Sequence, residues 1–270
     1  MKPDLQRRIQ RYGWDKAAPF YDSGWQSQIQ PAQAKLLEET GLWGGESVLD
    51  VSCGTGLITQ PIAEAVSPDG DVSGVDLSDQ MIEKARARLN GSHNNCSFRR
   101  MDAEDLTFEA EAFNVVICSL GLMYFPNPEK AIYEMFRVLK PDGRVSALVW
   151  GARRACGWAS IFPITDRRVE SEVCPLFFQL GTGDALERTF NNAGFSQTRS
   201  HRFSHKLEFK NDNEACLAAF QGGAVALAYQ KFDERTRREV RAEYLESIQK
   251  YKHENGYSIP AQFVIATGSK

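Results

Sequence analysis

Short apolar runs alternate with amphipathic stretches through the first 150 residues of the chain. The run Ser47-Val-Leu-Asp-Val leads straight into glycines, as a buried parallel strand does. Four further runs predict strands, and helical patterns separate most of them. Strands that alternate with helices indicate a doubly wound parallel sheet. The four further strands are expected at residues 71–76, 96–100, 114–119 and 144–150.

Capping residues mark several of the expected helices and turns. Ser78 precedes a segment with apolar residues on one side, which predicts a helix that ends near Asn90-Gly91. Asn127, followed by a proline in the first turn, predicts another helix. Lys140-Pro-Asp-Gly predicts the turn into the fifth strand, with Gly143 free to adopt a positive φ.

The pattern changes after Trp150. Residues 196–209 and 259–267 predict two strands that pair antiparallel at one edge of the sheet, with two helices between them. We therefore expect one α/β domain over residues 1–270, mostly parallel, with an antiparallel C-terminal edge strand. The segments outside this sheet lack its regular alternation and are predicted to form lid or cap elements at residues 1–40, 152–180 and 210–250.

Charge and composition exclude several classes of protein. The chain has 32 basic and 35 acidic residues, a net charge of −3, so no strongly basic surface for nucleic acid is expected. The N-terminal residues lack the apolar core of a signal peptide, and the longest apolar run, 113–125, is shorter than the ~20 residues that cross a bilayer. We expect a cytoplasmic protein without a membrane span. The six cysteines form no C-x-x-C pair, so no metal site is expected.

The run Asp50-Val-Ser-Cys-Gly-Thr-Gly lies where an open α/β sheet binds a nucleotide-like ligand. Glycines there let a ligand approach the backbone, and Asp50 could hold a cationic amino group or a water molecule. A tight turn without any ligand would use the same glycines. Asp76 ends the next strand, roughly 20 residues after this turn, where a carboxylate meets ribose hydroxyls. Thr59 replaces the third glycine of the dinucleotide fingerprint, which favours an adenosine ligand without a pyrophosphate.

Four motifs in order resemble the class I methyltransferases, and within them the ubiquinone/menaquinone-biosynthesis group of small-molecule enzymes. The likeness covers residues 48–150 and rests on Val48-Leu-Asp-Val-Ser-Cys-Gly-Thr-Gly, Gly74-Val-Asp-Leu-Ser-Asp-Gln-Met, Met101-Asp-Ala-Glu-Asp-Leu-Thr-Phe and Glu134-Met-Phe-Arg-Val-Leu-Lys-Pro-Asp-Gly-Arg. The resemblance implies a Rossmann-like fold with helical lid insertions. It also implies S-adenosylmethionine as cofactor and S-adenosylhomocysteine as product.

The resemblance assigns cofactor contacts residue by residue. Ser52 departs from the family, since most members have a glycine there, and the loop is expected to shift slightly. The implied contacts are Asp50, Ser52, Gly54 and Gly56 at the methionine part, Asp76 at the ribose, Leu77 and Met81 beside the adenine, Asp102 with Ala103 at the adenine amino group, and Ser119 with Leu120 near the methionine part.

The sequence says less about the residues that contact the methyl acceptor. Tyr12 and Tyr21 lie in a leader that resembles the segment folded over the cofactor in relatives, and Tyr124 follows the fourth strand. These three tyrosines are candidate substrate contacts, although core packing would also explain them. A weakly acidic acceptor needs a general base, and the candidate catalytic residues are Tyr21, Tyr124 and His201. His201 on an edge strand could equally be a solvated side chain.

The leading hypothesis is a methyltransferase that acts on oxygen, nitrogen or carbon of a small-molecule acceptor. An S-adenosylmethionine-binding regulatory or scaffold protein without turnover is the alternative. A nicotinamide-dependent oxidoreductase would require the glycine loop to bind a pyrophosphate despite Thr59. The acceptor, its reacting atom and the oligomeric state, for which a homodimer is one option, stay open.

Overall fold

The computed structural model describes residues 3–91, 93–170 and 173–270, and places five parallel strands where the sequence predicts them. The whole sheet has the order β3-β2-β1-β4-β5-β8-β6. The five parallel strands occupy its first five positions, which confirms the doubly wound arrangement. They are β1 (Ser47–Val51), β2 (Asp71–Asp76), β3 (Cys96–Arg100), β4 (Phe113–Ser119) and β5 (Leu139–Trp150).

Two long antiparallel strands complete the sheet, as predicted. The C-terminal strand β8 (Gly256–Ser269) pairs antiparallel with β5 on one side and with β6 (Ser196–Phe209) on the other. The short strand β7 (Lys252–His253) also pairs with β8. Because β8 is mostly buried and β6 is mostly exposed, β6 forms the outer edge and β8 lies one strand inside it. The polar residues of β6 suit this edge position.

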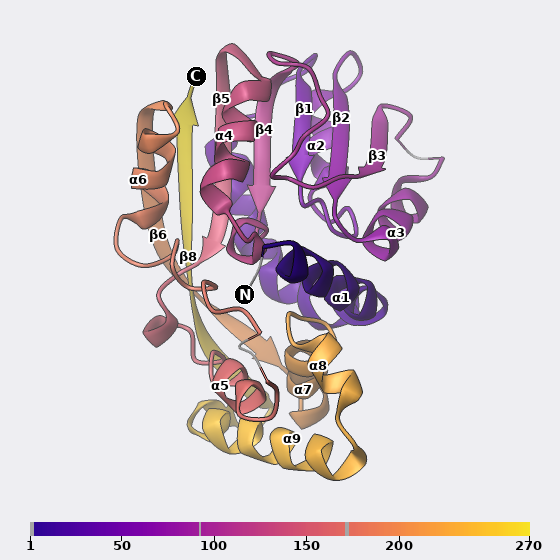
Figure 1. Cartoon of the computed structure of the whole chain (residues 1–270), viewed down its shortest axis with the longest axis vertical. Coiled ribbons are helices and arrows are strands. Elements are labelled where there is room, and N and C mark those ends of the chain that lie inside the picture. The colour runs from indigo at the N-terminus through magenta and orange to yellow at the C-terminus, as the bar shows by residue number, and fades with distance from the viewer. Residues whose placement is uncertain (1–2, 92, 171–172) are drawn as a thin grey trace.

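Helices cover both faces of the sheet, with α4 and α6 in front and α2 behind in the view of Figure 1. The predicted caps form: the Ser78 hydroxyl accepts a hydrogen bond from Met81 N (3.1 Å), and the Asn127 side chain accepts one from Lys130 N (3.0 Å). The flanking helices are α2 (Thr59–Val66), α3 (Asp79–Leu89), α4 (Pro128–Val138) and α6 (Ala185–Asn192), with the 3-10 turn η1 (Leu122–Tyr124) after β4.

The turn predicted at residues 140–143 lies inside β5 instead of before it, and its backbone differs from the prediction. Asp142, not Gly143, adopts the positive φ of 63°. A Cβ atom on Gly143 would lie 2.8 Å from the Lys140 carbonyl oxygen, so this glycine is required by a close approach of two backbone segments. The strand also begins earlier than expected, since Leu139 pairs with Phe113 across a register shift.

The N-terminal leader is a single helix, α1 (Pro3–Thr40), 38 residues long. Figure 1 shows its N-terminal part passing beneath the lower ends of β1, β2 and β4, where those strands have their carboxyl ends. Ala17, Ala18, Ile29 and Leu36 are buried along its length. This helix therefore forms one wall of the crevice at the carboxyl edge of the sheet.

A second group of helices gathers around the lower ends of β6 and β8 (Figure 1). The sequence predicts two helices between β6 and β8, but three α-helices form there, because residues 226–231 make an additional short helix. The group comprises α5 (Ile161–Asp166), α7 (Asp212–Phe220), α8 (Ala226–Lys231) and α9 (Glu234–Ile248), with the 3-10 turns η2 (Arg153–Ala155) and η3 (Gln249–Tyr251). Within the described residues, no helix is both long and apolar enough to span a membrane.

Candidate active site

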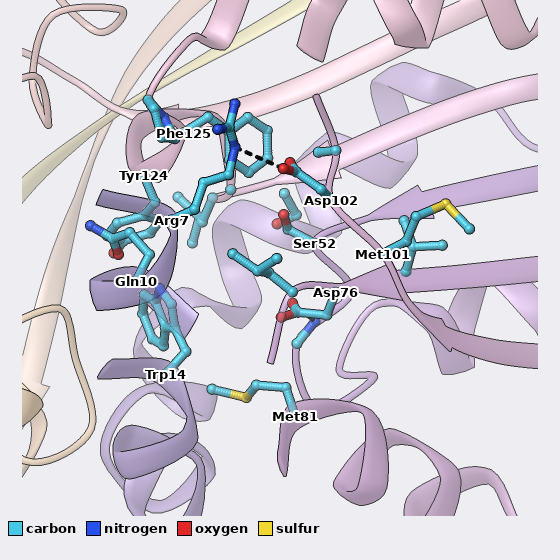
Figure 2. A pocket seen from close by; sticks show the side chains of 18 of the residues that line it. Arg7, Gln10, Trp14, Ser52, Asp76, Met81, Met101, Asp102, Tyr124 and Phe125 are labelled. Atoms are coloured by element: carbon cyan, nitrogen blue, oxygen red, sulfur yellow. Dashed lines mark hydrogen bonds and ion pairs between the residues drawn. The ribbon is translucent and has the colours of Figure 1, made fainter. Parts of the chain in front are cut away.

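A cavity of about 740 Å³, part of it open to solvent, lies between the carboxyl ends of the parallel strands and α1. Figure 2 shows Arg7, Gln10 and Trp14 of α1 on one side, opposite Ser52 and Asp76. The cavity brings together residues that the sequence assigned from the N-terminal leader, from the first three of the four motifs and from the segment after the fourth strand. Those that line it are Tyr21, Ser52, Gly54, Asp76, Leu77, Met81, Asp102, Ala103, Ser119, Leu120 and Tyr124.

Asp76 fixes the glycine-rich loop as well as facing the cavity. Its Oδ2 accepts a hydrogen bond from Gly54 N (3.0 Å), and its Oδ1 accepts one from Ser78 N (2.9 Å). Burial raises the pKa of Asp76 to about 6, and the hydrogen bonds from backbone amides oppose that rise. Each carboxylate oxygen has two lone pairs, so both can still accept a hydrogen bond from a ligand hydroxyl.

Asp50, in β1 just before the glycine-rich loop, is fully buried and is not among the described residues that line the cavity. Its Oδ2 accepts a hydrogen bond from the Thr59 hydroxyl (2.6 Å), but its Oδ1 has no hydrogen-bond partner among the described residues. Burial, with a smaller contribution from the nearby charge of Asp76, raises the pKa of Asp50 to about 7, and the hydrogen bond from Thr59 opposes that rise. An unpaired buried carboxylate oxygen is costly, so this site fits a ligand that donates a hydrogen bond or brings a positive charge.

Gly54 and Gly56 have different roles, although both belong to one motif. Gly54 has φ +55° and lines the cavity, and an added Cβ atom there would meet open space. Gly56 has φ +80°, and its Cβ atom would lie 3.1 Å from Leu89 and 3.3 Å from Ala85 of α3. Gly56 is therefore required for close packing of the loop against α3, and it does not line the cavity.

Ser52, the departure from the family pattern, has φ +58°, a region that favours glycine. Gly121 lies against it, because a Cβ atom on Gly121 would be 2.6 Å from the Ser52 Cβ atom. The loop therefore keeps the backbone conformation of a glycine while carrying a small side chain. The lack of a side chain at Gly121 provides the space for it.

Ser52→Gly is expected to stabilise the fold slightly, by up to about 1 kcal/mol, since relief of the left-handed strain exceeds the entropy cost of an added glycine. Urea unfolding measures the change. Ser73→Gly in β2 is the matched control, and it should destabilise the protein by roughly 0.5–1 kcal/mol because that position is ordinary strand. Equal losses in the two variants would show that Ser52 is not strained.

Asp102 already has a partner on α1. Its Oδ2 lies 2.8 Å from Arg7 Nε, as the dashed line in Figure 2 marks, and its Oδ1 accepts a hydrogen bond from Glu104 N (2.9 Å). Arg7 also pairs with Glu104, whose side chain is only 1% exposed. The carboxylate of Asp102 keeps lone pairs for a ligand, with the Arg7 side chain beside it.

Charged residues of α1 attach the helix to the edge of the sheet. Arg11 pairs with Asp79, Asp15 accepts a hydrogen bond from the Ser78 hydroxyl (2.6 Å), and Asp22 pairs with Arg88 (2.7 Å). The sequence analysis missed this role. The signal was present, because Arg7, Arg11, Asp15 and Asp22 recur at spacings of four and seven residues and so share one face of the helix.

Two of the acceptor-side candidates do not reach the cavity. Tyr12 is 49% exposed, with the Arg11 guanidinium over its ring. His201 lies on β6 with its Nδ1 2.8 Å from Glu39 Oε1, near the C-terminal end of α1. Roughly 27 Å of helix separates Glu39 from Tyr21, which lines the cavity, at 1.5 Å per residue. An edge-strand position and a solvated ion pair explain His201 without a catalytic role.

A second cavity of about 500 Å³ adjoins the first and shares four residues with it: Trp14, Tyr21, Leu120 and Tyr124. None of the described residues that line it is charged. Burial raises the pKa values of Tyr21 and Tyr124, so both are protonated at neutral pH and are donors there. The other lining residues are Trp25, Ile29, Trp150, Trp158, Ile161, Phe162, Phe177, Ala219, Gly223, Ala224 and Val225.

Comparison with known proteins agrees with this geometry. The family described as Methyltransferase domain matches residues 48–143. A demethylmenaquinone methyltransferase of Lactococcus lactis is 41% identical over 114 residues, which span 42% of this chain and 45% of that relative. The demethylmenaquinone methyltransferase of Staphylococcus aureus strain JH9 is 32% identical over 184 residues, 63% of this chain and 76% of the relative.

A solved structure shows the same fold over most of the chain. It is a candidate methyltransferase from Bacillus halodurans C-125, with a TM-score of 0.64 and 23% identity, and the match covers 89% of this chain and 99% of that one. The extent of the Staphylococcus match determines the family, and three of the four motifs meet at the cavity. The chain belongs to the class I S-adenosylmethionine-dependent methyltransferases, in the group that includes the demethylmenaquinone methyltransferases.

Proposed function

We propose that the protein transfers a methyl group from S-adenosylmethionine to an oxygen, nitrogen or carbon atom of a small-molecule acceptor. The observation that supports this most is the pair of adjoining cavities. One is lined by the carboxylates of Asp76 and Asp102, which suit a nucleoside, and the other is apolar and uncharged among the described residues. A regulatory protein that only binds the cofactor would not need the second cavity.

In this proposal the adenosine part of the cofactor lies along the ends of β2 and β3. Asp76 accepts hydrogen bonds from the ribose hydroxyls, with both of its oxygens near the cavity. Leu77 and Met81 contact the adenine ring, and Asp102 with Ala103 lies at its amino group. The ion pair with Arg7 holds the Asp102 carboxylate in place.

The methionine part would lie over the glycine-rich loop. Asp50, whose Oδ1 is buried without a partner, suits the cationic amino group. Four of the other residues assigned to the methionine part line the cavity, and they are Ser52, Gly54, Ser119 and Leu120. Gly56 contributes indirectly, because its packing against α3 fixes the loop.

The bound cofactor supplies an activated methyl group on a sulfonium, and the chain has to align the acceptor and exclude water. Trp14, Tyr21 and Tyr124 stand in the wall that both cavities share, where an acceptor would meet the cofactor. Because both tyrosines are protonated at neutral pH, we propose that they orient the acceptor by donating hydrogen bonds. Their assignment as bases would require an unusual loss of a proton on binding.

Further proposals concern partners and location. The net charge of −3 supports a small-molecule acceptor over nucleic acid. The residues outside the sheet, 1–40, 152–180 and 210–250, are proposed to act as lid elements of a single domain. Residues of the first segment line both cavities, and residues of the other two line the second cavity. A cytoplasmic location and assembly as a homodimer stay predictions, to be checked by cell fractionation and light scattering.

Calorimetric titration with S-adenosylmethionine and S-adenosylhomocysteine tests the proposal, with NAD as the control ligand. Micromolar binding of both sulfur compounds and none of NAD is expected. A screen of small molecules with radiolabelled methyl donor then tests turnover. Binding without transfer to any acceptor would favour the regulatory alternative, and a folded protein that binds neither sulfur compound would refute the proposal.

A further inference from the structure

We propose that the outer edge of β6 is a docking site for an acidic, extended segment of a partner protein, which would pair with residues 200–206 as a further strand of the sheet. The strand β6 is the last in the sheet, and among the described residues only β8 pairs with it. Residues of β6 line neither of the two cavities. This edge is therefore separate from the site of the proposed methyl transfer.

The even-numbered residues of β6 direct their backbone N–H and C=O groups away from β8. Glu208 shows this, because its N–H donates to Gln28 Oε1 and its carbonyl oxygen accepts from Gln28 Nε2, each at 2.7 Å. Lys206 agrees with it, since its partner Pro260 has no N–H, and the Pro260 carbonyl accepts from Gly157 N instead. Because the two kinds of pair alternate along antiparallel strands, the outward groups belong to Ser200, Arg202, Ser204 and Lys206.

This part of the edge is open and has defined ends. Its four residues are exposed, and their outward backbone groups have no hydrogen-bond partner within the part of the chain that the structure describes. At one end the Gln28 side chain occupies the edge, and at the other Gln197, with φ +49°, interrupts the pairing of β6 with β8. An exposed row of unpaired N–H and C=O groups is a template for the addition of another strand.

Helices on both faces hold β6 in place. His201 pairs with Glu39 near the end of α1. On the opposite face the Ser200 hydroxyl donates a hydrogen bond to Glu187 of α6. The edge is therefore preformed, and a partner strand would bind it without first having to order it.

The charge of this edge indicates which kind of strand it binds. Residues 199–207 include three cations, two histidines and no carboxylate. None of the cations forms an ion pair among the described residues, and they are Arg199, Arg202 and Lys206. A second copy of this chain would bring the same cations alongside, and like charges across paired strands are unfavourable. An acidic segment would instead pair its carboxylates with them.

An open groove of about 610 Å³ adjoins the C-terminal end of this edge. Its described lining includes Lys206, Lys210 and one carboxylate, that of Glu208, which already accepts a hydrogen bond from the Ser258 hydroxyl (2.6 Å). Residues that flank the added strand would lie in this groove, and the excess of lysine favours acidic ones. The groove and the edge therefore select the same kind of segment.

Fluorescence anisotropy with the full-length protein measures the affinity for labelled peptides of about seven residues. The acidic peptide alternates valine with glutamate. Of the comparison peptides, one has lysine in place of glutamate, one has threonine there, and one is the acidic peptide with methylated backbone nitrogens. We expect the acidic peptide to bind at least about tenfold more tightly than any of the others, because it alone offers both carboxylates and backbone donors.

Hydrogen exchange measured residue by residue locates the bound peptide. In the free protein the outward amides of Ser200 and Ser204 are expected to exchange faster than those of His201 and His205, which face β8. A saturating amount of the acidic peptide should slow the outward amides by about tenfold or more and leave the inward ones unchanged.

Ser204→Pro removes one outward N–H and keeps the pairing with β8, and proline is tolerated at such edge positions. It should weaken binding of the acidic peptide by about five- to tenfold, while Ser204→Ala, the matched control, stays within about twofold. Lys206→Glu should weaken binding by a similar factor, and Lys130→Glu, at an exposed lysine of α4, should not. Circular dichroism checks that each variant is folded.

Equal affinities for the acidic peptide and its methylated form, or for the acidic and lysine peptides, would overturn this proposal. Protection of other amides with Ser200 and Ser204 unaffected would do the same, as would failure of the folded protein to bind the acidic peptide. Light scattering tests the competing occupant. A dimer that Ser204→Pro dissociates would show that a second copy of the chain occupies the edge, which also contradicts the proposal.

Discussion

Replacing Asp76 with alanine is expected to weaken S-adenosylhomocysteine binding by about 3 kcal/mol, roughly a hundredfold. Two losses combine in this variant. The ribose hydroxyls lose a charged acceptor, and Gly54 N and Ser78 N lose the oxygens that hold the glycine-rich loop. Calorimetric titration at pH 8, where the carboxylate is ionised, measures the change.

Asp71→Ala is the matched control for this prediction. Asp71 begins the same strand, is exposed, and lies at the opposite end from the cavity. Its replacement should leave the affinity within about twofold, because an exposed side chain remote from the ligand contributes little. Asp76→Asn keeps an acceptor oxygen and should fall between the two. Unchanged affinity in Asp76→Ala, with the fold intact by circular dichroism, would refute the ribose assignment.

Binding of S-adenosylhomocysteine is expected to tighten by roughly thirtyfold between pH 5.5 and pH 8. Burial raises the pKa of Asp50 to about 7, and the proposed partner of Asp50 is a cationic amino group, which binds the ionised form. Below its pKa the carboxyl group must lose a proton before it can pair. The affinity should therefore fall about tenfold per pH unit below pH 7 and level off above it.

Asp50→Asn provides the control for the pH dependence. It should bind more weakly than the unaltered protein at pH 8 and show a much flatter profile, since the remaining change comes from Asp76, whose pKa is about 6. Titration in two buffers of different ionisation enthalpy counts the protons released. A profile in the variant as steep as in the unaltered protein would show that Asp50 does not pair with the ligand.

The same two carboxyl groups affect the stability of the free protein in the opposite sense. Their pKa values in the folded state lie above those of the unfolded chain, so the folded protein binds more protons between about pH 4 and 7. Their contribution to stability is therefore greatest below that window and is lost as the pH rises through it. Ligand binding offsets this loss, since the cationic amino group stabilises the ionised form of Asp50.

The sequence predicted the sheet well because apolar runs and capping residues indicate strands and helices locally. Apolar runs located β1 to β5, and Ser78 and Asn127 formed the caps that their residue types favour. The backbone at residues 140–143, inside β5, was harder to predict. The choice between Asp142 and Gly143 for the positive φ depended on the close approach of Gly143 to Lys140. The third helix between β6 and β8 also lacked a clear periodic signal, since α8 has only six residues.

By itself the sequence determined the fold class and the cofactor half of the candidate site, because three of the four motifs and the segment after β4 lie at strand ends that a parallel sheet brings to one edge. Only the tertiary structure decided the other half. It placed Arg7, Gln10 and Trp14 of α1 over the cavity, moved His201 away from it, and assembled the second cavity. The physical reason is that these contacts join segments far apart along the chain, and local patterns do not show which distant segments meet.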